Sequence, residues 1–464
     1  MRQNDIMATG EPKVGRRFAG YKTNSVSQFT YILFLYFICD FFLRFSVRLP
    51  GYGVIRPTLL AVASISLLLF LQRDKLKDRF NDPIFRIIFV LLSYIVVSLP
   101  FVEWPGSVLR LNIDTFIRSV VFLFFTALIV DTEKRLVWFV SVFVFCQVFR
   151  VLEPLFLNIT QGYWGSATHL SGGDFANRLA GAPADVINPN ELGFVIATVI
   201  PFLHYLLFPR GWLCKLLYLL IMPALLYALI LTMSRGGFIA LLVVAFMVFK
   251  ESRYKFRLAA LAVVVVVAAF NVMTPIQKDR YLSLIDRDTA GGASAEGRLR
   301  GMVREFELGL TRPIVGHGLG TTPEAKTHKL GSRQASHNLY AELLIELGVI
   351  GFVIFLIFLA RSAKQLLIMR DSIGKIKDDR LIFYQRLNKV MVCLFWMYAV
   401  YSINYWGLSQ YYWYLFGGMT IALTRLASSA INKRDCDAID IVDDSEVAEA
   451  NRFVLAKRLR YRKH

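Results

Sequence analysis

The sequence predicts an all-α, polytopic integral membrane protein with about twelve transmembrane helices and a large outer loop that carries short helices. Composition is the first observation behind this prediction, because 56% of the residues are hydrophobic and the mean hydropathy is +0.50. The second is the placement of charge. The formal net charge of +19 is concentrated in short connections between apolar runs, where membrane topology accounts for it without a nucleic-acid partner.

The transmembrane helices are predicted from apolar runs of spanning length, some of them short or tilted. These runs fall near residues 29–46, 57–72, 84–102, 115–131, 136–157, 191–208, 212–232, 236–249, 257–275, 338–360, 389–407 and 410–426. The runs at 57–72 and 236–249 are the shortest of them.

Basic residues indicate which way the chain is inserted. They populate three short connections, at residues 73–79, 250–257 and 361–386. With the predicted spans, all three connections fall on the same side as both termini. The positive-inside rule places that side in the cytoplasm.

This topology divides the chain into three parts. We expect a cytoplasmic N-terminal segment (1–25), a transmembrane domain (26–426) and a cytoplasmic tail (427–464). The long loops at about 158–190 and 276–337 then lie on the opposite face, and the second of them is rich in arginine. Long loops cross a membrane regardless of charge, so this basic loop does not upset the topology.

Several kinds of site are not indicated. The five cysteines form no CxxC pair, and the histidines form no HxxxH or HExxH pattern, so we expect no zinc site. There is no Walker A loop for ATP and no GxSxG elbow for a hydrolase. Asp286 and Asp288 have a DxD spacing that can hold a divalent cation, but two acids at this spacing arise easily by chance. We expect neither a metal nor a cofactor.

The stretch from Gly316 to Gly351 carries the strongest candidate for catalysis. A glycine-rich, basic segment runs into Ser336-His337-Asn338, and an apolar helix follows directly. His337 is therefore expected beside the free N–H groups of a helix start, which favours a neutral imidazole that can accept a proton. The glycines at 316, 318 and 320 allow backbone to approach a ligand closely. The alternative is that Asn338 caps the helix and His337 is an incidental neighbour.

Arginines on the outer face are candidates for binding an anion. Arg235 stands between two apolar runs, where a guanidinium is costly unless it reaches water, pairs or serves a ligand. The adjacent Gly236 and Gly237 are expected to open space beside it. Arg178 is the only arginine or lysine of the first long loop, and we expect it to be a second contact for the anion. Asn190 in the same loop is a plausible helix N-cap.

Residues 297–310 predict an amphipathic helix that lies in the membrane interface, because their apolar residues recur at helical spacing. Arg298, Arg300 and Arg304 flank its apolar stripe. We expect one of these three arginines to bind an anion, and the spacing leaves open which one.

Four stretches together resemble the O-antigen ligase and Wzy-type polymerase superfamily of bacterial envelope glycosyltransferases. RLAG…NPNELG is similar to the family's arginine–glycine–NPN stretch, and SRGGFIALLV resembles its Ser-Arg segment. GRLRGMVREFELGLTRPIVGHGLGT is similar to its arginine and P-x-x-G-x-G stretch. SHNLYAELLIELGVIGF matches the pattern of His-Asn, nine residues and Gly-x-x-Gly. The ligase pattern often continues with threonine, where this chain has Phe352, so ligase and polymerase both stay open.

The resemblance implies a GT-C-like, metal-independent, inverting glycosyltransferase of the bacterial inner membrane, with its active site facing the periplasm. Its donor would be a glycan on undecaprenyl diphosphate, and its acceptor another glycan or lipid A–core. Carried over residue by residue, His337 is the catalytic histidine, and Arg235 with Arg298 or Arg304 holds the donor diphosphate. The rival interpretation is a transporter that flips a lipid-linked oligosaccharide. It predicts two similar halves and charges buried mid-span.

Overall fold

The structure is a computed structural model that describes residues 25–169, 175–282, 292–331, 333, 336–374, 376, 378–405 and 407–435, without the side chains of residues 169, 292–296 and 298. A helix covers every predicted apolar run. These helices are α1 (Gln28–Leu43), α3 (Pro57–Leu71), α4 (Pro83–Ser98), α6 (Ile113–Ile129), α7 (Glu133–Gln161), α8 (Pro189–Phe202), α9 (Trp212–Thr232), α10 (Arg235–Glu251), α11 (Lys255–Val272), α15 (Leu339–Gly374), α16 (Ile382–Tyr401) and an unlabelled helix at 411–435.

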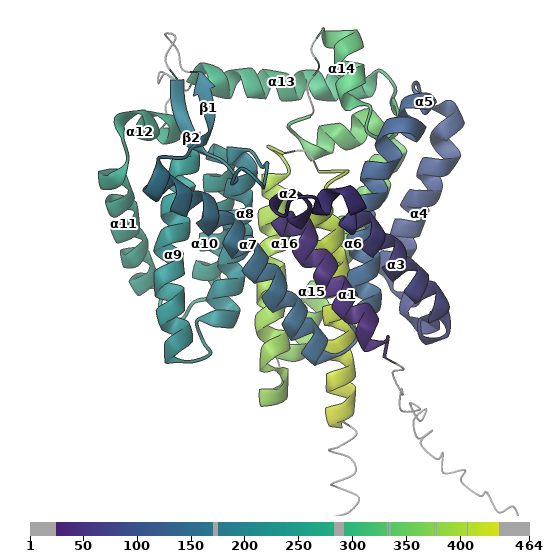
Figure 1. Cartoon of the computed structure of the whole chain (residues 1–464), viewed down its shortest axis with the longest axis horizontal. Coiled ribbons are helices and arrows are strands. Elements are labelled where there is room, and N and C mark those ends of the chain that lie inside the picture. Colours follow the sequence, from purple (N-terminus) through teal and green to yellow (C-terminus); the bar gives the residue numbers. More distant parts are fainter. Residues whose placement is uncertain are drawn as a thin grey trace, which may run out of the picture.

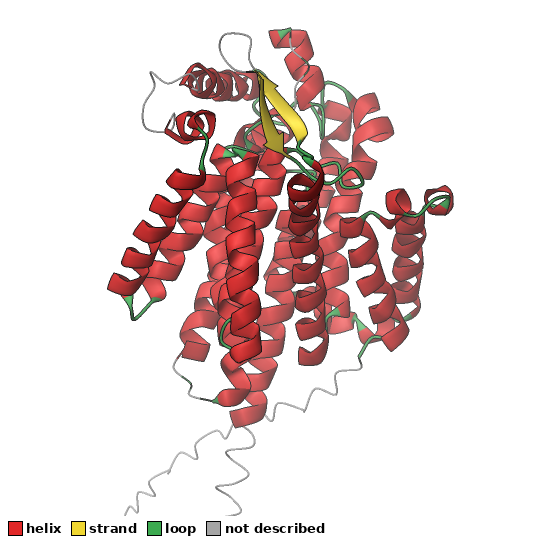
Figure 2. Ribbon diagram, turned by 60° about the vertical axis from the view of Figure 1, so that its left-hand side comes forward, coloured by secondary structure: helices red, strands yellow, loops and turns green. Residues whose placement is uncertain are grey.

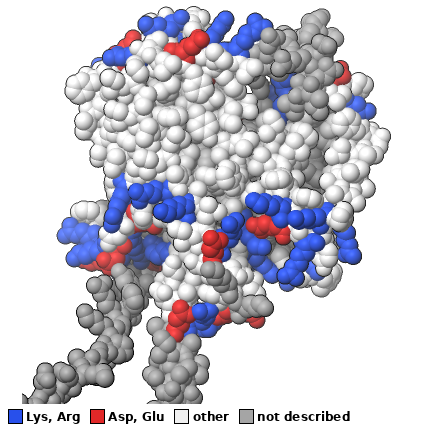
Figure 3. All heavy atoms as spheres, turned by 180° about the vertical axis from the view of Figure 1, so that it is seen from behind, with Lys and Arg blue, Asp and Glu red and all other residues white. Residues whose placement is uncertain are grey.

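The bundle has the character of a membrane protein. Within the described residues, eight helices are long and apolar enough to cross a membrane, judged by length and composition. Seen from behind, Lys and Arg side chains gather toward the two ends of the molecule and leave a belt without charge between them (Figure 3). The structure therefore confirms an all-α polytopic membrane protein, and the number of twelve spans stays a prediction. The last helix continues to residue 435, beyond the boundary expected at 426.

Both predicted outer loops lie at one end of the bundle (Figure 1). The loop at 276–337 carries three helices, which are α12 (Pro275–Leu282), α13 (Gly292–Leu310) and α14 (Thr322–Leu330). The short helix α5 (Pro105–Ser107) also lies at this outer end, and α2 (Phe45–Arg48) follows directly after α1. The basic connections after α3 and α10 lie at the opposite end, which we call the inner end.

The loop at 158–190 contains a β-hairpin that the sequence analysis did not predict. Strands β1 (Gly165–His169) and β2 (Phe175–Leu179) pair antiparallel, with Ser166 opposite Arg178 (Figure 2). Each strand is short and built mainly from small and polar residues, so it lacks the β-branched alternation that marks a strand in a sequence.

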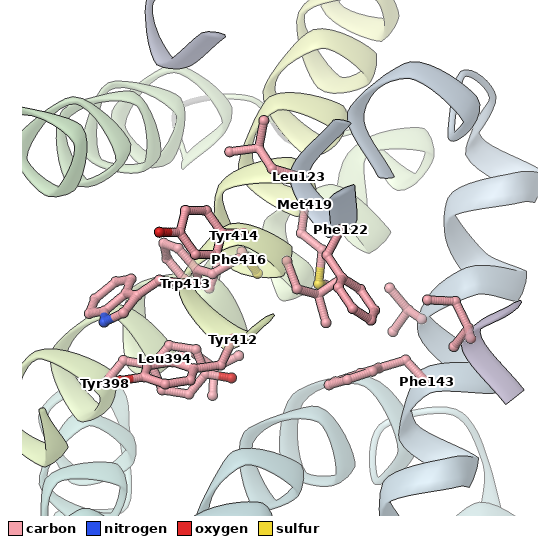
Figure 4. Packing of buried hydrophobic residues seen from close by; sticks show 14 of the residues in the cluster. Phe122, Leu123, Phe143, Leu394, Tyr398, Tyr412, Trp413, Tyr414, Phe416 and Met419 are labelled. Carbon is pink, nitrogen blue, oxygen red and sulfur yellow. The ribbon is translucent and has the colours of Figure 1, made fainter. Parts of the chain in front are cut away.

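The hydrophobic core is rich in aromatic rings where α16 meets the helix at 411–435 (Figure 4). Trp413 is fully buried, and its ring lies edge-on to Tyr398 with 5.6 Å between the centroids. Tyr398 also contacts Tyr412 and Phe416. Edge-to-face pairs of this kind add to the free energy gained by burial. They hold the outer end of α16 in place, and the candidate site is built around that end.

Helix α15 is broken at Gly348, although the sequence analysis expected one continuous span. Gly348 has a φ of 64°, in the left-handed region that favours glycine. Because the helix is interrupted there, the carbonyl oxygens of Ile345 and Glu346 accept hydrogen bonds from the backbone N–H of His317 (2.7 Å) and of Gly318 (3.0 Å). The glycine-rich segment is thereby joined directly to the start of α15.

Candidate functional site

The glycines of this segment serve packing within the protein. A Cβ on Gly316 would lie 2.5 Å from the carbonyl carbon of Glu346, and one on Gly320 would lie 2.5 Å from the side chain of Asn112. A Cβ on Gly348 would lie 2.4 Å from the backbone oxygen of Ile314. The sequence analysis expected Gly316, Gly318 and Gly320 to let the backbone approach a ligand closely. The structure shows them facing neighbouring backbone and side chains, so their small size closes the fold around the site.

His337 lies at the junction of a loop and a helix, as the sequence predicted. Its side chain is exposed, and the neighbours on both sides are buried and held. Oδ1 of Asn338 accepts hydrogen bonds from the backbone N–H of Tyr340 (2.8 Å) and Ala341 (3.1 Å), so Asn338 caps α15. The Ser336 hydroxyl donates to Glu305 of α13, at 2.7 Å. An exposed imidazole between two anchored residues has a defined position.

The carboxylate of Glu305 is itself buried and paired. It accepts a hydrogen bond from the Lys326 ammonium at 2.7 Å, so α13 and α14 are tied together beneath the His337 loop. A buried carboxylate without such a cation would be costly, and the pair explains why a charged residue faces inward here.

The start of α15 is also bound to the end of α16. The backbone N–H of Leu339 donates to the carbonyl oxygens of Ser402 (2.9 Å) and Tyr405 (3.0 Å). This N–H belongs to the first turn of α15, whose donors have no partner within the helix. The segment after α16 supplies that partner, and it places Tyr405 at the start of α15.

Asn190 binds two residues that belong to, or lie next to, the candidate arginines Arg178 and Arg235. Its Oδ1 accepts a hydrogen bond from Nη2 of Arg178 at 3.0 Å and one from the Ser234 hydroxyl at 3.2 Å. The sequence analysis predicted Asn190 as the helix N-cap, and that prediction is wrong. Asn188 caps α8, in a capping box with Glu191, which leaves the Asn190 side chain available to the site.

Two tyrosines connect this group to α16. The Tyr401 hydroxyl donates to the backbone oxygen of Asn190 at 2.9 Å. The Tyr405 hydroxyl donates to Glu191. Tyr405 thus touches α8 with its side chain and the start of α15 with its backbone.

Arg235 begins α10 at the corner between α9 and α10. Ser234 caps that helix by accepting a hydrogen bond from Gly237 N–H at 3.1 Å, and Arg235 is buried, with 6% of its surface exposed. The adjacent glycines do not open space for a ligand as expected. A Cβ on Gly237 would lie 2.9 Å from Cα of Gly193, and one on Gly236 would lie 3.3 Å from the ring of Tyr401. They let α8 and α16 approach the corner closely.

Arg178 and Arg280 hold the same corner from two other elements. Nε of Arg178, on β2, donates to the carbonyl oxygen of Thr232 at 2.8 Å. Nε of Arg280, on α12, donates to that of Met233 at 2.9 Å. Two guanidinium groups therefore meet the chain where α9 ends and α10 begins, and Arg235 is the first residue of α10. The pKa of Tyr281 is raised by burial, and the nearby charges of Arg178 and Arg280 oppose that shift.

The sequence analysis did not single out Arg280 among the arginines of the outer loop. The sequence did not predict that Arg280 lies near Arg235, because the two are more than forty residues apart and Arg280 is not part of a motif that we recognised. The contact with Met233 shows its place in the site.

The arginines of α13 have a different position. The helix is confirmed and begins at Gly292, somewhat before the predicted start at 297. Arg300 and Arg304 are exposed on it, and the described contacts do not connect Arg304 with Arg178 or Arg235. Arg298 lies in the same helix, and its side chain is outside the described part of the chain. Which of these arginines binds an anion stays a prediction.

The possible metal site at Asp286 and Asp288 lies outside the described residues. Elsewhere in the described ranges, no group of three or more His, Cys, Asp or Glu residues could hold a metal ion.

Comparison with known proteins connects this geometry to one family. The profile of the family described as O-antigen ligase matches residues 219–356. That range includes Arg235, Arg280, His337 and the break at Gly348, and it leaves out Arg178. No curated protein sequence matches the chain. The match confirms the resemblance to the O-antigen ligase and Wzy-type superfamily that the motifs indicated.

Proposed function

Proceeding from its similarity to the O-antigen ligase family over residues 219–356, we propose that this chain is a glycosyltransferase of the bacterial inner membrane. It transfers a glycan from undecaprenyl diphosphate to an acceptor glycan or to lipid A–core, at the periplasmic face. One observation carries the proposal. Arg178, Arg235 and Arg280 gather at the α9–α10 corner, and α16 connects that corner to the loop of His337.

The arginines suit a diphosphate donor. A diphosphate carries several negative oxygens, and guanidinium groups bind such oxygens with strong, charge-assisted hydrogen bonds. Charge that develops on the leaving group is stabilised most when the cations are already held in place. Arg178 and Arg280 are held by the consecutive carbonyls of Thr232 and Met233, which supports this role.

His337 supplies the base. The acceptor hydroxyl attacks the anomeric carbon of the donor sugar, and the imidazole takes up the hydroxyl proton. As the new carbon–oxygen bond forms, the bond to the diphosphate oxygen breaks, and undecaprenyl diphosphate leaves with the electron pair. Attack opposite the leaving group inverts the configuration. The exposed position of His337 on an anchored loop supports this assignment.

We propose that no divalent cation takes part, because the arginine charges replace it. Purified protein with a lipid-linked donor should transfer glycan equally well with and without EDTA. Loss of activity to EDTA, with recovery in magnesium or manganese, would contradict this and return attention to Asp286 and Asp288.

Ligase and polymerase are separated by the surface glycan of a deletion strain, resolved on a gel. Single repeat units that remain attached to their acceptor indicate a polymerase. Long chains that remain on the lipid carrier indicate a ligase. If the deletion changes neither the length of the surface glycan nor its transfer from the lipid carrier, the proposal is contradicted. The family match does not favour the rival transporter interpretation.

A further inference from the structure

A cavity of about 470 Å³ lies at the inner end of the bundle, between the first turns of α1 and α7. It is remote in the fold from the arginine corner, which lies at the outer end (Figure 1). Its volume is within the usual range for small-ligand sites, and the proposed function gives it no part.

The lining of this cavity changes from polar to apolar along the bundle axis. On α1, Gln28 lies at the end of the molecule, and Ile32 and Leu35 lie one and two turns deeper. On α7, Lys134 lies at the end, and Trp138 lies one turn deeper. Both helices therefore present charge and hydrogen-bonding groups at the inner end and apolar surface toward the middle of the bundle.

The apolar part of the lining opens outward. Ile32 and Trp138 are each 56% exposed, in the belt that the membrane would cover. Lys134 is exposed beside them, whereas the neighbouring Arg135 is buried and paired with Asp131 at 2.8 Å. Of the two cations that line the cavity, Lys134 is thus the one that can meet a ligand, and Trp138 is of the type that prefers the membrane boundary.

We propose that this cavity binds an anionic phospholipid, with the phosphate headgroup at Lys134 and an acyl chain along Ile32, Leu35 and Trp138. The polarity gradient of the cavity has the same direction as that of a lipid in the cytoplasmic leaflet. A soluble anion needs no apolar wall, so the gradient favours a lipid. The site anchors α1 to α7 through a bound lipid and is independent of glycan transfer.

Binding of dioleoyl-phosphatidylglycerol to the full-length chain in detergent, followed by native mass spectrometry, tests the proposal. Lys134→Gln should weaken binding about fivefold, as expected for one lysine near an anionic headgroup. Trp138→Ala should weaken it as well. Dioleoyl-phosphatidylcholine should bind the unmodified chain more weakly than the anionic lipid.

The chain offers a matched control at the same end of the bundle. Lys215 and the exposed Trp212 stand three residues apart on the first turn of α9, and neither lines this cavity. Lys215→Gln should leave binding unchanged. Equal losses for Lys134→Gln and Lys215→Gln would show general attraction to a charged belt and overturn the site. Displacement of the lipid by glycerol phosphate, which has no acyl chain, would show a site for soluble anions instead.

Discussion

Nη2 of Arg178 lies 3.0 Å from Oδ1 of Asn190, and this hydrogen bond connects the β-hairpin to the first turn of α8. The same oxygen accepts the hydroxyl of Ser234, the residue before Arg235. The Asn190 amide therefore positions Arg178 directly, and it positions Arg235 through Ser234, which caps α10. Hydrogen bonds to a charged group stabilise by about 1.5–3 kcal/mol, more than those between neutral groups.

Asn190→Ala removes the hydrogen bonds that position Arg178 and Ser234, and it should reduce transfer at least about tenfold, chiefly through a higher KM for the lipid-linked donor. A tenfold loss corresponds to about 1.4 kcal/mol of transition-state stabilisation. Asn188→Ala is the matched control two residues away. It removes the cap of α8 and should cost about 1 kcal/mol of stability, with little effect on KM. Steady-state kinetics and thermal unfolding of both variants separate the two roles. Equal KM values for the two variants would contradict the role given to Asn190.

Arg235→Lys should be almost as damaging as Arg235→Ala. Lysine keeps the charge but has no planar fork for two phosphate oxygens. Arg118→Lys is the control, since Arg118 is exposed on α6 and pairs with Asp114, and it should retain activity close to that of the unmodified protein. The donor KM and kcat of the three variants provide the measurement. If lysine at 235 restores most of the activity, Arg235 acts as a point charge, and its assignment as a ligand for two phosphate oxygens is wrong.

The parts of this structure that follow local rules were predictable. Apolar runs predicted the long helices of the bundle, and the His337-Asn338 pair predicted the start of α15, because length, polarity and capping are encoded by neighbouring residues. The role of Asn190 was missed because it depends on Arg178, Ser234 and Tyr401, and Tyr401 is more than two hundred residues away. Tertiary partners of that kind leave no periodic signal in one sequence.

The break in α15 was missed for a similar reason. The sequence analysis noticed Gly348 only as part of a Gly-x-x-Gly pattern, and its left-handed φ and the approach of Ile314 show why a side chain is excluded. In the sequence, Arg280 is one of many arginines in a basic loop. Only its contact with Met233 in the structure distinguishes it from the others.

Gly348→Ala should destabilise the protein by at least about 2 kcal/mol. An L-residue in the left-handed region costs about 1–2 kcal/mol, and the new Cβ would also meet the oxygen of Ile314 at 2.4 Å. Gly301→Ala, in α13, is the control, because no atom lies within 4 Å of its added Cβ. Thermal unfolding of the purified protein should show a lower Tm for the first variant and an equal or higher Tm for the second. A similar Tm for both would show that the break tolerates a side chain.

The topology can be tested with single cysteines in a background that lacks the five native ones. A membrane-impermeant thiol reagent, added to intact spheroplasts, should label a cysteine at position 300 and leave positions 253 and 370 unlabelled. The reason is that the outer loops and the basic connections lie at opposite ends of the bundle. Labelling at 253 or 370 from outside would reverse the orientation and remove the site from the periplasm.

The central claim is that His337 takes the proton from the acceptor, and the most direct measurement is glycan transfer by purified His337→Ala. His328→Ala provides the control, because His328 is also exposed at the outer end but stacks on Trp104 with 5.4 Å between the ring centroids. We predict that His337→Ala lowers kcat by about 10²–10⁴-fold without lowering Tm, the usual range for a positioned base, and that His328→Ala stays active. Full activity of His337→Ala with a purified lipid-linked donor would contradict the account.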